Sequence, residues 1–331
     1  MAEPAQRPAA PDLRETEEWF VSHGLPYFVD DIRAEVHRGL ARGRLARVAL
    51  VAMLLASAVV VGFALAPDLR WDDGLVLGIN LGLLSVVVYG LFTLRAWVIA
   101  KWAGHRTFSS LSLLFPLVTR ALPLLLLFVT FLFINAEVWE VSSRLDGGVM
   151  WLTVALFLII TVGFLLVRLP EELAGFDEHV QLDELARHLD GTPLAGVRLP
   201  DDEDLTQDVA IEGLQKANLL LMLLITQLVQ VLLLSASVFV FFVVFGLLVM
   251  EPTIVEGWTG ESPEGIPFLE RANWQLLQVS TFLAAFSGLY FTVYAVTDEI
   301  YRKQFFTSII HELERAVSVR AVYRSLRREA G

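Results

Sequence analysis

The sequence predicts an all-α membrane protein with six transmembrane helices, and three observations carry this prediction. First, 55% of the 331 residues are apolar and only 19% are charged, whereas charged residues make up about a quarter of a typical soluble domain. Second, the apolar residues form long blocks, and a helix needs about 20 apolar residues to cross the roughly 30 Å hydrocarbon core of a bilayer. Third, the lysines and arginines lie almost entirely between alternate blocks.

Six apolar blocks are long enough to span a membrane. Five of them have clear ends: Val48–Ala66, Leu75–Leu94, Ala121–Ile134 with an extension to Val141, Val149–Val167 and Trp274–Val296. The sixth block, Leu219–Met250, has no proline and no glycine before Gly246. Because it contains no turn signal, it holds one helix, which at 1.5 Å per residue is about 48 Å long. We therefore place its membrane crossing at Val231–Met250 and its beginning at or below the inner interface.

The third block allows two boundaries. A start at Leu111 would bury Arg120 near the middle of the membrane, at a cost of about 2.5–3.5 kcal/mol on insertion scales. A start at Ala121 leaves Arg120 at the boundary and brings Glu137 about one turn inside the far edge, which costs less. Prolines on both sides of the arginine favour a kink, or a short interfacial helix over Phe108–Val118.

The positive charges orient the six helices. Of the 25 lysines and arginines, 22 lie in segments that six spans place on one side, residues 1–47, 95–120, 168–216 and 297–331. The other side receives only Arg70, Arg144 and Arg271. Cytoplasmic loops carry the excess of Lys and Arg, so we predict that both termini lie in the cytoplasm and that the protein is a multi-pass protein of a cytoplasmic (inner) membrane.

This topology divides the chain into five segments. They are a cytoplasmic N-terminal segment (1–47), transmembrane helices one to four (48–168), an acidic cytoplasmic linker (169–215), transmembrane helices five and six (216–297), and a cytoplasmic C-terminal helix (298–331).

The two terminal segments are predicted to contain amphipathic helices. Trp19–Val29, which reads WFVSHGLPYFV, is interpreted as an anchor at the membrane interface, where Trp, Tyr and Phe are favoured. In the C-terminal segment, apolar residues recur at helical spacing and arginines accompany them, which predicts a basic amphipathic helix. The apolar positions are Tyr301, Phe305, Ile309, Leu313 and Val317.

Catalytic signatures are missing from the sequence. It has no Gly-rich loop ending in Lys and Ser or Thr, no G-x-S-x-G elbow and no cysteine. The run HELER at 311–315 lacks the second histidine of a zinc-protease helix. The pairs His179/Asp183 and Glu184/His188 fit salt pairing on a solvated helix better than metal binding. With a net charge of −12, nucleic acid is disfavoured as a partner. We expect no enzyme, no cofactor and no metal site.

Polar side chains within apolar spans are costly and tend to mark functional pathways. The candidates lie toward the ends of their spans: Asn80, Glu137, Glu140, Gln227, Gln230, Gln275 and Gln278, with Arg120 at a boundary. Among them Glu137 is the strongest, because an ionised carboxylate at that depth needs a partner or water. The alternative is structural, with the Glu137 carboxylate reaching the interface or accepting a hydrogen bond from Asn80 or Gln278.

Two spans carry stripes of small residues at four-residue spacing. Gly74, Gly78 and Gly82 lie on the second span, and Ser280, Ala284 and Gly288 lie on the sixth. Small residues let helix backbones approach closely. We expect these stripes to pack helices within one subunit, with a homo-oligomer interface as the alternative.

The stretches WFVSHGLPYFV at 19–29 and TRALPLLLLFVTFLFINAEVWEV at 119–141 resemble integral membrane proteins of actinobacteria that have no assigned activity. The resemblance implies a multi-pass bacterial membrane protein and carries over no functional residue. The first hypothesis for function is an ion or small-solute channel or transporter, since polar residues lie near span ends and the outer loops are acidic. The alternatives are a non-catalytic membrane scaffold or regulator and, more remotely, an intramembrane enzyme. The bilayer is the expected partner, and protein partners stay open.

Overall fold

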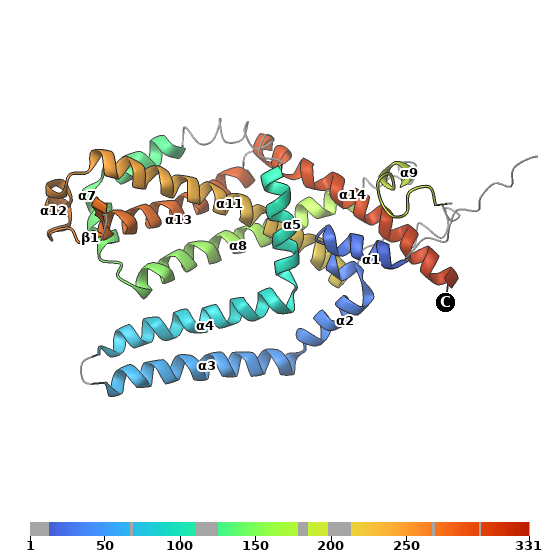
Figure 1. Ribbon diagram of the computed structural model, residues 1–331, viewed down its shortest axis with the longest axis horizontal. Helices are drawn as coiled ribbons and strands as arrows, with labels where there is room; N and C mark the ends of the chain where they lie inside the picture. The colour runs from blue at the N-terminus through green and yellow to red at the C-terminus, as the bar shows by residue number, and fades with distance from the viewer. Residues whose placement is uncertain are drawn as a thin grey trace, which may run out of the picture.

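The computed structural model describes residues 13–66, 69–109, 125–177, 185–197, 213–266, 269–297 and 299–330. Within these ranges, five helices are long and apolar enough to cross a membrane, or up to six if a bent helix pair is one span. The long helices run along the long axis of the molecule (Figure 1). The prediction of an all-α protein with several membrane-spanning helices is therefore confirmed.

The five long helices match five of the six predicted spans. They are α3 (Arg42–Leu65), α4 (Trp71–Thr93), α8 (Gly148–Asp177), α11 (Leu214–Val249) and α13 (Trp274–Thr297). Helix α11 is continuous over 36 residues, so the sixth apolar block contains no turn, as its sequence predicts. Helix α8 also extends beyond its apolar part, which ends at Pro170.

The predicted third span is bent. Helix Leu125–Phe133 and α7 (Ala136–Ser143) meet at an angle of 73°, so the extension of the third span to Val141 does not continue the preceding helix in a straight line, and the two helices count as one span only if the span is broken. Asn135 explains the break, because its side-chain oxygen accepts a hydrogen bond of 3.1 Å from the backbone N–H of Val138 and caps α7. Arg120, and the predicted interfacial helix beyond Ser109, lie outside the described residues.

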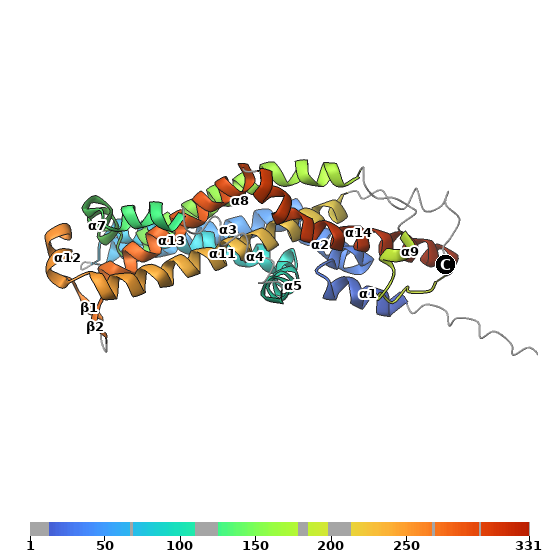
Figure 2. The ribbon, with the colours of Figure 1, turned by 90° about the horizontal axis from the view of Figure 1, so that it is seen from above.

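Helix α7 belongs to a compact group of short elements at one end of the bundle. The others are α12 (Pro252–Thr259) and the antiparallel strands β1 (Gly265–Ile266) and β2 (Leu269–Asn273), which Figures 1 and 2 show beside α7. Trp139 of α7 is fully buried and packs against Phe133 and Trp258. Phe133 in turn stacks on Phe242 of α11 at 4.7 Å. An apolar cluster thus closes this end, which we call the loop end.

Helices α3 and α4 form a hairpin that is largely separate from the other spans. They lie side by side (Figure 1), and only 6% of the most apolar window of each is buried. Large apolar side chains cover their outer surfaces, among them Leu54, Val86 and Phe92. A helix pair with apolar side chains on all sides is suited to contact with the lipid chains of a membrane. We call this element the hairpin.

Helix α5 (Ala96–Ser109) stands across the long helices (Figure 1). Ile99 and Ala103 are buried, whereas Trp97 and Phe108 on its outer side are exposed. This helix occupies much of the region that the sequence leaves as a loop between the second and third spans.

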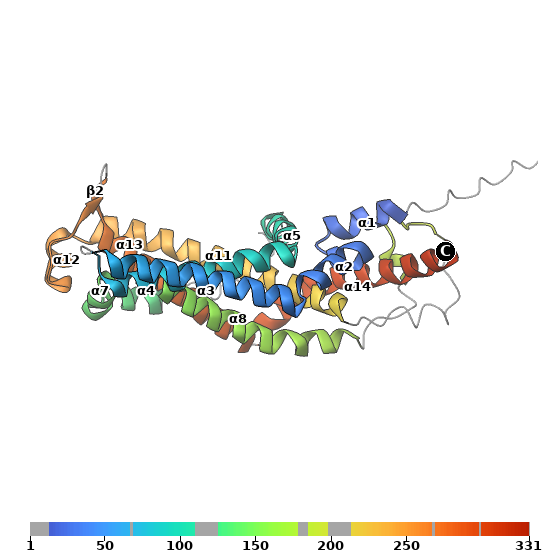
Figure 3. The same ribbon diagram turned by 90° about the horizontal axis from the view of Figure 1, so that it is seen from below.

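A second group of helices forms the opposite end of the molecule. It contains α1 (Leu13–Ser22), the 3₁₀ turn η1 (Pro26–Phe28), α2 (Asp30–Gly39), α9 (Leu185–His188), the first turns of α11, and α14 (Glu299–Ala330). We call it the end domain. Its apolar core includes Phe20, Phe28, Leu219, Leu223 and Tyr323, and Figures 1 to 3 place α1 and the C-terminal part of α14 side by side there.

The aromatic segment 19–29 lies inside the end domain, which corrects its interpretation as an interfacial anchor. Phe20, Tyr27 and Phe28 are at most 2% exposed, so they are shielded from lipid by the protein itself. Phe20 packs edge-on against Tyr323 of α14 at 5.7 Å. The aromatic residues therefore build a protein core, and the helix that covers them comes from the other end of the chain.

Helix α14 uses its arginines for contacts within the protein. Leu313 and Val317 are buried, as the predicted amphipathic pattern requires. Arg315 Nη2 donates hydrogen bonds of 3.0 Å to the carbonyl oxygens of Asp190 and Gly191. Arg327 forms an ion pair of 2.6 Å with Asp30. These contacts hold α14 against the other elements of the end domain.

Candidate functional site

The two acidic candidates lie on the exposed side of α7, after the bend. The Glu140 carboxylate pairs with Arg144 at 2.8 Å, and Glu137 occupies the first turn of the helix. A negative charge at a helix N-terminus is favourable. Glu137 therefore lies after the bend at Asn135, and its predicted place about one turn inside the far edge of the third span stays a prediction.

The two amides proposed as partners of Glu137 bond elsewhere. Asn80 Nδ2 donates to the carbonyl oxygens of Val76, at 2.9 Å, and of Gly148, at 3.0 Å. Gln278 Nε2 donates to Asp146 Oδ1 at 3.1 Å. Both amides tie the beginning of α8, or the turn before it, to a neighbouring span, so their visible role is structural.

Gln275 has a similar role at the loop end. Its Oε1 accepts a hydrogen bond of 3.1 Å from the backbone N–H of Glu264, which fixes the start of the β hairpin against α13. Like Asn80, it satisfies a backbone group near the end of a span.

Gln227 on α11 differs from the other candidates. Its side chain is 1% exposed, and among the residues that the structure describes neither Nε2 nor Oε1 has a hydrogen-bond partner. Oε1 of Gln230, less than one turn further on, also lacks one. Buried polar groups are nearly always hydrogen-bonded. These two glutamines of α11 are therefore unusual, because they have buried hydrogen-bonding atoms that no described residue contacts.

The small-residue stripe of α4 packs this helix against α3. A Cβ added to Gly74 would lie 2.5 Å from Phe63 Cβ, and one added to Gly78 would lie 2.9 Å from the carbonyl oxygen of Ala56. Gly82 is further away, at 4.0 Å from Ala56 Cβ. Within the chain, this stripe therefore packs α4 closely against α3.

The stripe of α13 faces α11. A Cβ on Gly288 would lie 2.4 Å from Ser235 Oγ and 3.1 Å from a methyl group of Val231. Ser280 and Ala284 on the same helix are buried. The two helices approach closely at Gly288, and this contact too lies within one subunit.

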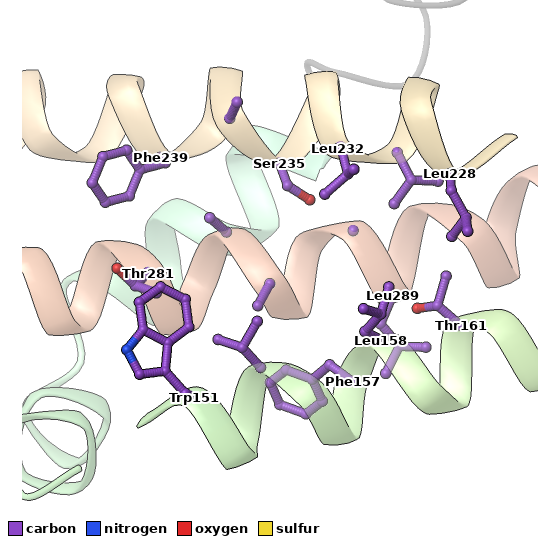
Figure 4. Close-up of a pocket in the computed structure, with 16 residues that line it drawn as sticks. Trp151, Phe157, Leu158, Thr161, Leu228, Leu232, Ser235, Phe239, Thr281 and Leu289 are labelled. Atoms are coloured by element: carbon purple, nitrogen blue, oxygen red, sulfur yellow. The ribbon is translucent and has the colours of Figure 1, made fainter. Parts of the chain in front are cut away.

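A cavity of about 450 Å³ lies between α8, α11 and α13. Figure 4 shows the side chains of the three helices around it, with Trp151, Phe157 and Leu158 coming from α8 and Leu232, Ser235 and Phe239 from α11. Helix α13 contributes mostly small residues: Thr281, Ala284, Ala285 and Gly288. The stripe that brings α13 close to α11 thus also leaves space beside it.

The cavity is apolar and opens on the outside of the bundle. Trp151, Leu158 and Leu232 at its edge are exposed. Its few polar side chains are hydroxyls, and that of Thr281 already donates to the carbonyl oxygen of Leu277 at 2.7 Å. On α11 the lining runs from Leu228 to Phe239, about 16 Å of helix. This geometry suits an elongated apolar molecule that enters from the bilayer.

Sequence reasoning did not find the cavity. The cavity forms where small residues of two helices face each other. They are Ala284 and Gly288 on α13 and Ser235 and Ala236 on α11. This arrangement is visible only when the register between the helices is known. Within the described residues, no three His, Asp or Glu side chains gather where they would hold a metal ion.

No protein-family model matches the chain, and no curated protein and no solved structure is significantly similar to it.

Proposed function

We propose that the chain is a non-catalytic regulatory protein of a bacterial cytoplasmic membrane. It binds an apolar molecule of the bilayer in the cavity, and this binding changes the conformation of the end domain. The positive-inside rule places the end domain and both termini in the cytoplasm. In this proposal the loop end faces outward and the bent pair counts as the sixth span.

One observation carries the proposal: each of the three helices that line the cavity leads into the end domain. Helix α11 begins there, with Leu219 and Leu223 in the end-domain core. Helix α8 contributes Leu165 and Leu169 to the same core. Helix α13 is followed after one residue by α14, the longest helix of the end domain.

Rigid helices that connect two sites supply the contiguous contacts through which binding at one site biases the other. A ligand that spreads α8 from α11 in the membrane would shift the ends of these helices against the core around Tyr323. Only a ligand whose affinity differs between the two arrangements can do so.

The test uses purified full-length protein in a maltoside detergent and a fluorescent fatty acid as the apolar probe. We expect saturable binding that Ala236→Phe and Ala285→Phe, at the cavity lining, weaken at least tenfold. Ala58→Phe on the exposed surface of the hairpin is the matched control and should leave binding unchanged. In the same samples, probe binding should alter hydrogen exchange of the α14 amides.

Two outcomes count against the proposal. Equal binding by all variants would mean that the probe does not use the cavity. Binding that leaves hydrogen exchange of α14 unchanged would refute the coupling while retaining the cavity as a lipid site.

A second candidate, solute transport, is favoured by one observation, the buried amide of Gln227, which has no hydrogen-bond partner among the described residues. A polar group left without a partner in a span is available to a passing solute. Protein reconstituted in liposomes should then show ion or solute flux that Gln227→Leu lowers, and absence of flux in the native protein would exclude this candidate. The outward-facing Glu137 provides the comparison, since Glu137→Gln tests the original pathway hypothesis.

A further inference from the structure

The outer surface of α3 changes from basic to apolar along one stripe. Arg44, Arg47, Val51 and Leu54 follow one another at spacings of three and four residues, which places them on one face of the helix. All four side chains are exposed. The stripe therefore faces away from the hairpin, with its arginines at the end nearest the end domain and its apolar residues beyond them.

The length of α3 places the two arginines at the edge of a bilayer. From Val48 to its end at Leu65 the helix is about 27 Å long, and the hydrocarbon core of a bilayer is roughly 30 Å thick. When α3 crosses this core, Arg47 lies at its boundary and Arg44 lies about 4–5 Å beyond it. Lipid headgroups occupy roughly 5–8 Å on each side of the core, so both guanidinium groups reach the headgroup layer.

Contacts with α4 fix this end of α3. The Tyr89 hydroxyl donates a hydrogen bond of 2.9 Å to the carbonyl oxygen of Gly39, the last residue of α2. A Cβ added to Gly39 would lie 2.4 Å from Thr93 Cγ2. The Tyr27 hydroxyl donates to the carbonyl oxygen of Leu94 at 2.5 Å. The turn between α2 and α3 is thus held against the end of α4, and the end domain lies directly beside the headgroup layer.

Helix α5 marks the same level independently. It begins directly after the end of α4 and stands across the long helices (Figure 1), so it runs along the surface of a bilayer that the hairpin crosses. Its exposed side carries Trp97, Lys101 and Phe108. Tryptophan is favoured at the headgroup level, and a lysine beside it complements anionic headgroups.

The two arginines of the stripe form no ion pair with the described residues. Arg47 Nε donates to the carbonyl oxygen of Gly43 in its own helix, at 3.2 Å. At the opposite end of the hairpin, by contrast, Arg70 forms two hydrogen bonds with the Asp72 carboxylate, of 3.1 and 2.6 Å. Guanidinium groups match the oxygen geometry of phosphate, and the stripe presents two of them at the level of the lipid phosphates.

We propose that this stripe binds an anionic phospholipid of the leaflet on the end-domain side. The lipid phosphate lies between Arg44 and Arg47, and an acyl chain lies along Val51 and Leu54. A zwitterionic lipid has the same phosphate but also a compensating positive charge, so the positive charge of the stripe favours an anionic lipid. The site lies outside the cavity and requires only that the hairpin crosses the bilayer, so it does not rest on the proposed function.

The experiment is native mass spectrometry of the full-length protein, freed of lipid in a maltoside detergent and mixed with equal amounts of phosphatidylglycerol and phosphatidylcholine. The native protein should bind phosphatidylglycerol more tightly. The double variant Arg44→Gln with Arg47→Gln should weaken this binding at least tenfold, because each basic residue near an anionic membrane surface strengthens the attraction roughly fivefold. Both side chains are exposed, so the replacement should leave the fold intact.

The matched control is Arg70→Gln, which removes an exposed arginine from the opposite end of the same hairpin and should leave phosphatidylglycerol binding unchanged. Equal binding of the two lipids by the native protein would overturn the proposal, and so would equal weakening by the double variant and the control.

A second arm separates a lipid from a soluble anion. Glycerophosphate carries the phosphate without the acyl chains and should not displace phosphatidylglycerol, because Val51 and Leu54 contribute to the binding of the chain. Displacement by an equal concentration of glycerophosphate would assign the arginines to a soluble anion and would overturn the proposal as well. Failure of the apolar probe to bind the cavity would leave these results unaffected.

Discussion

The backbone N–H of Tyr27 donates a hydrogen bond of 2.8 Å to Oδ1 of Asn218, a residue 191 positions further along the chain. The Nδ2 group of the same amide donates to the carbonyl oxygen of Gly24 at 3.0 Å. Asn218 is fully buried on α11, and with both ends of its amide it holds the turn between α1 and α2. The turn itself relies on Gly24, whose φ of +76° few other residues adopt.

Asn218→Leu should therefore destabilise the end domain. It would leave two buried backbone groups without a partner, and each such group costs about 1–3 kcal/mol, so we expect a loss of roughly 2–6 kcal/mol. The measurement is equilibrium unfolding in detergent. Ser237→Ala is the control, because the exposed Ser237 hydroxyl bonds only to its own helix. A loss no larger than that of the control would show that Asn218 does not hold the turn.

The two glycines Gly78 and Gly90 of α4 should respond to alanine in opposite directions. At Gly78 the new methyl group would lie 2.9 Å from the Ala56 carbonyl oxygen, whereas at Gly90 no atom of the described residues lies within 4 Å of it. Gly78→Ala should separate α3 from α4 and lower the melting temperature. Gly90→Ala should raise stability by about 0.5–1 kcal/mol, because alanine is the better helix former. Stabilisation by both changes would contradict the close approach of the helices.

Replacement of Gln227 by leucine should stabilise the protein. The amide of Gln227 is buried and has no partner in the part of the chain that the structure describes, and removal of such a group recovers about 1–3 kcal/mol of desolvation cost. Gln275→Leu should have the opposite effect, since Gln275 Oε1 accepts from the Glu264 backbone. Unfolding midpoints of the two variants, measured together, check the difference in sign. Destabilisation by Gln227→Leu would indicate that the amide has a partner in the folded protein.

Trp139 should be the most sensitive residue of the loop end. It is fully buried, and its indole N–H donates to the Phe133 carbonyl oxygen at 2.6 Å. Truncation of a buried tryptophan to alanine typically costs about 3–5 kcal/mol, and Trp139→Ala should fall in this range. Trp97→Ala removes the same side chain from an exposed site on α5 and should cost much less. Similar losses for both would argue against the apolar cluster that closes this end.

Stability at alkaline pH should depend on Tyr323. Burial, reinforced by the Glu17 carboxylate, raises the pKa of this phenol from 10.0 to about 12. The unfolded state then loses its proton at lower pH than the folded state does, so the stability that Tyr323 contributes is complete below about pH 10 and is lost as the pH rises toward 12.

The comparison of Tyr323→Phe with the native protein isolates this effect. At about pH 8 the variant should be less stable, because the hydrogen bond from Tyr323 to Glu17 is missing. As the pH approaches 12 the difference between the two proteins should shrink. Melting temperatures across this range are the measurement, and a difference that does not change with pH would contradict the raised pKa.

Features set by local composition could be predicted from the sequence. The five long helices follow from the length of their apolar blocks, and the continuity of α11 follows from the absence of Pro and Gly before Gly246. The packing role of Gly74 and Gly78 follows from their spacing on one helix face. In each case the residues that determine the feature lie within a single helix.

Features that depend on distant residues could not be predicted. The local sequence signal for the bend before α7 is Asn135. Its role as a helix cap becomes visible only in the structure, where its side chain accepts a hydrogen bond from the Val138 backbone. An aromatic segment such as residues 19–29 has the same sequence pattern whether lipid or protein covers it. Its burial inside the protein depends on contacts with the distant residues Tyr323 and Asn218. The cavity depends on the register between helices that lie far apart in the sequence.

The contact between Glu17 and Tyr323 joins residues 306 positions apart, and this separation sets the order in which the protein can be assembled during synthesis. At about 5–20 residues per second, roughly 15–60 s pass between the translation of α1 and that of the helix that covers it. During this time Phe20 and Phe28 emerge from the ribosome without their native cover, while the spans are inserted one after another. The end domain can thus be completed only after α14 has been translated, and a chain truncated before α14 would expose these aromatic side chains.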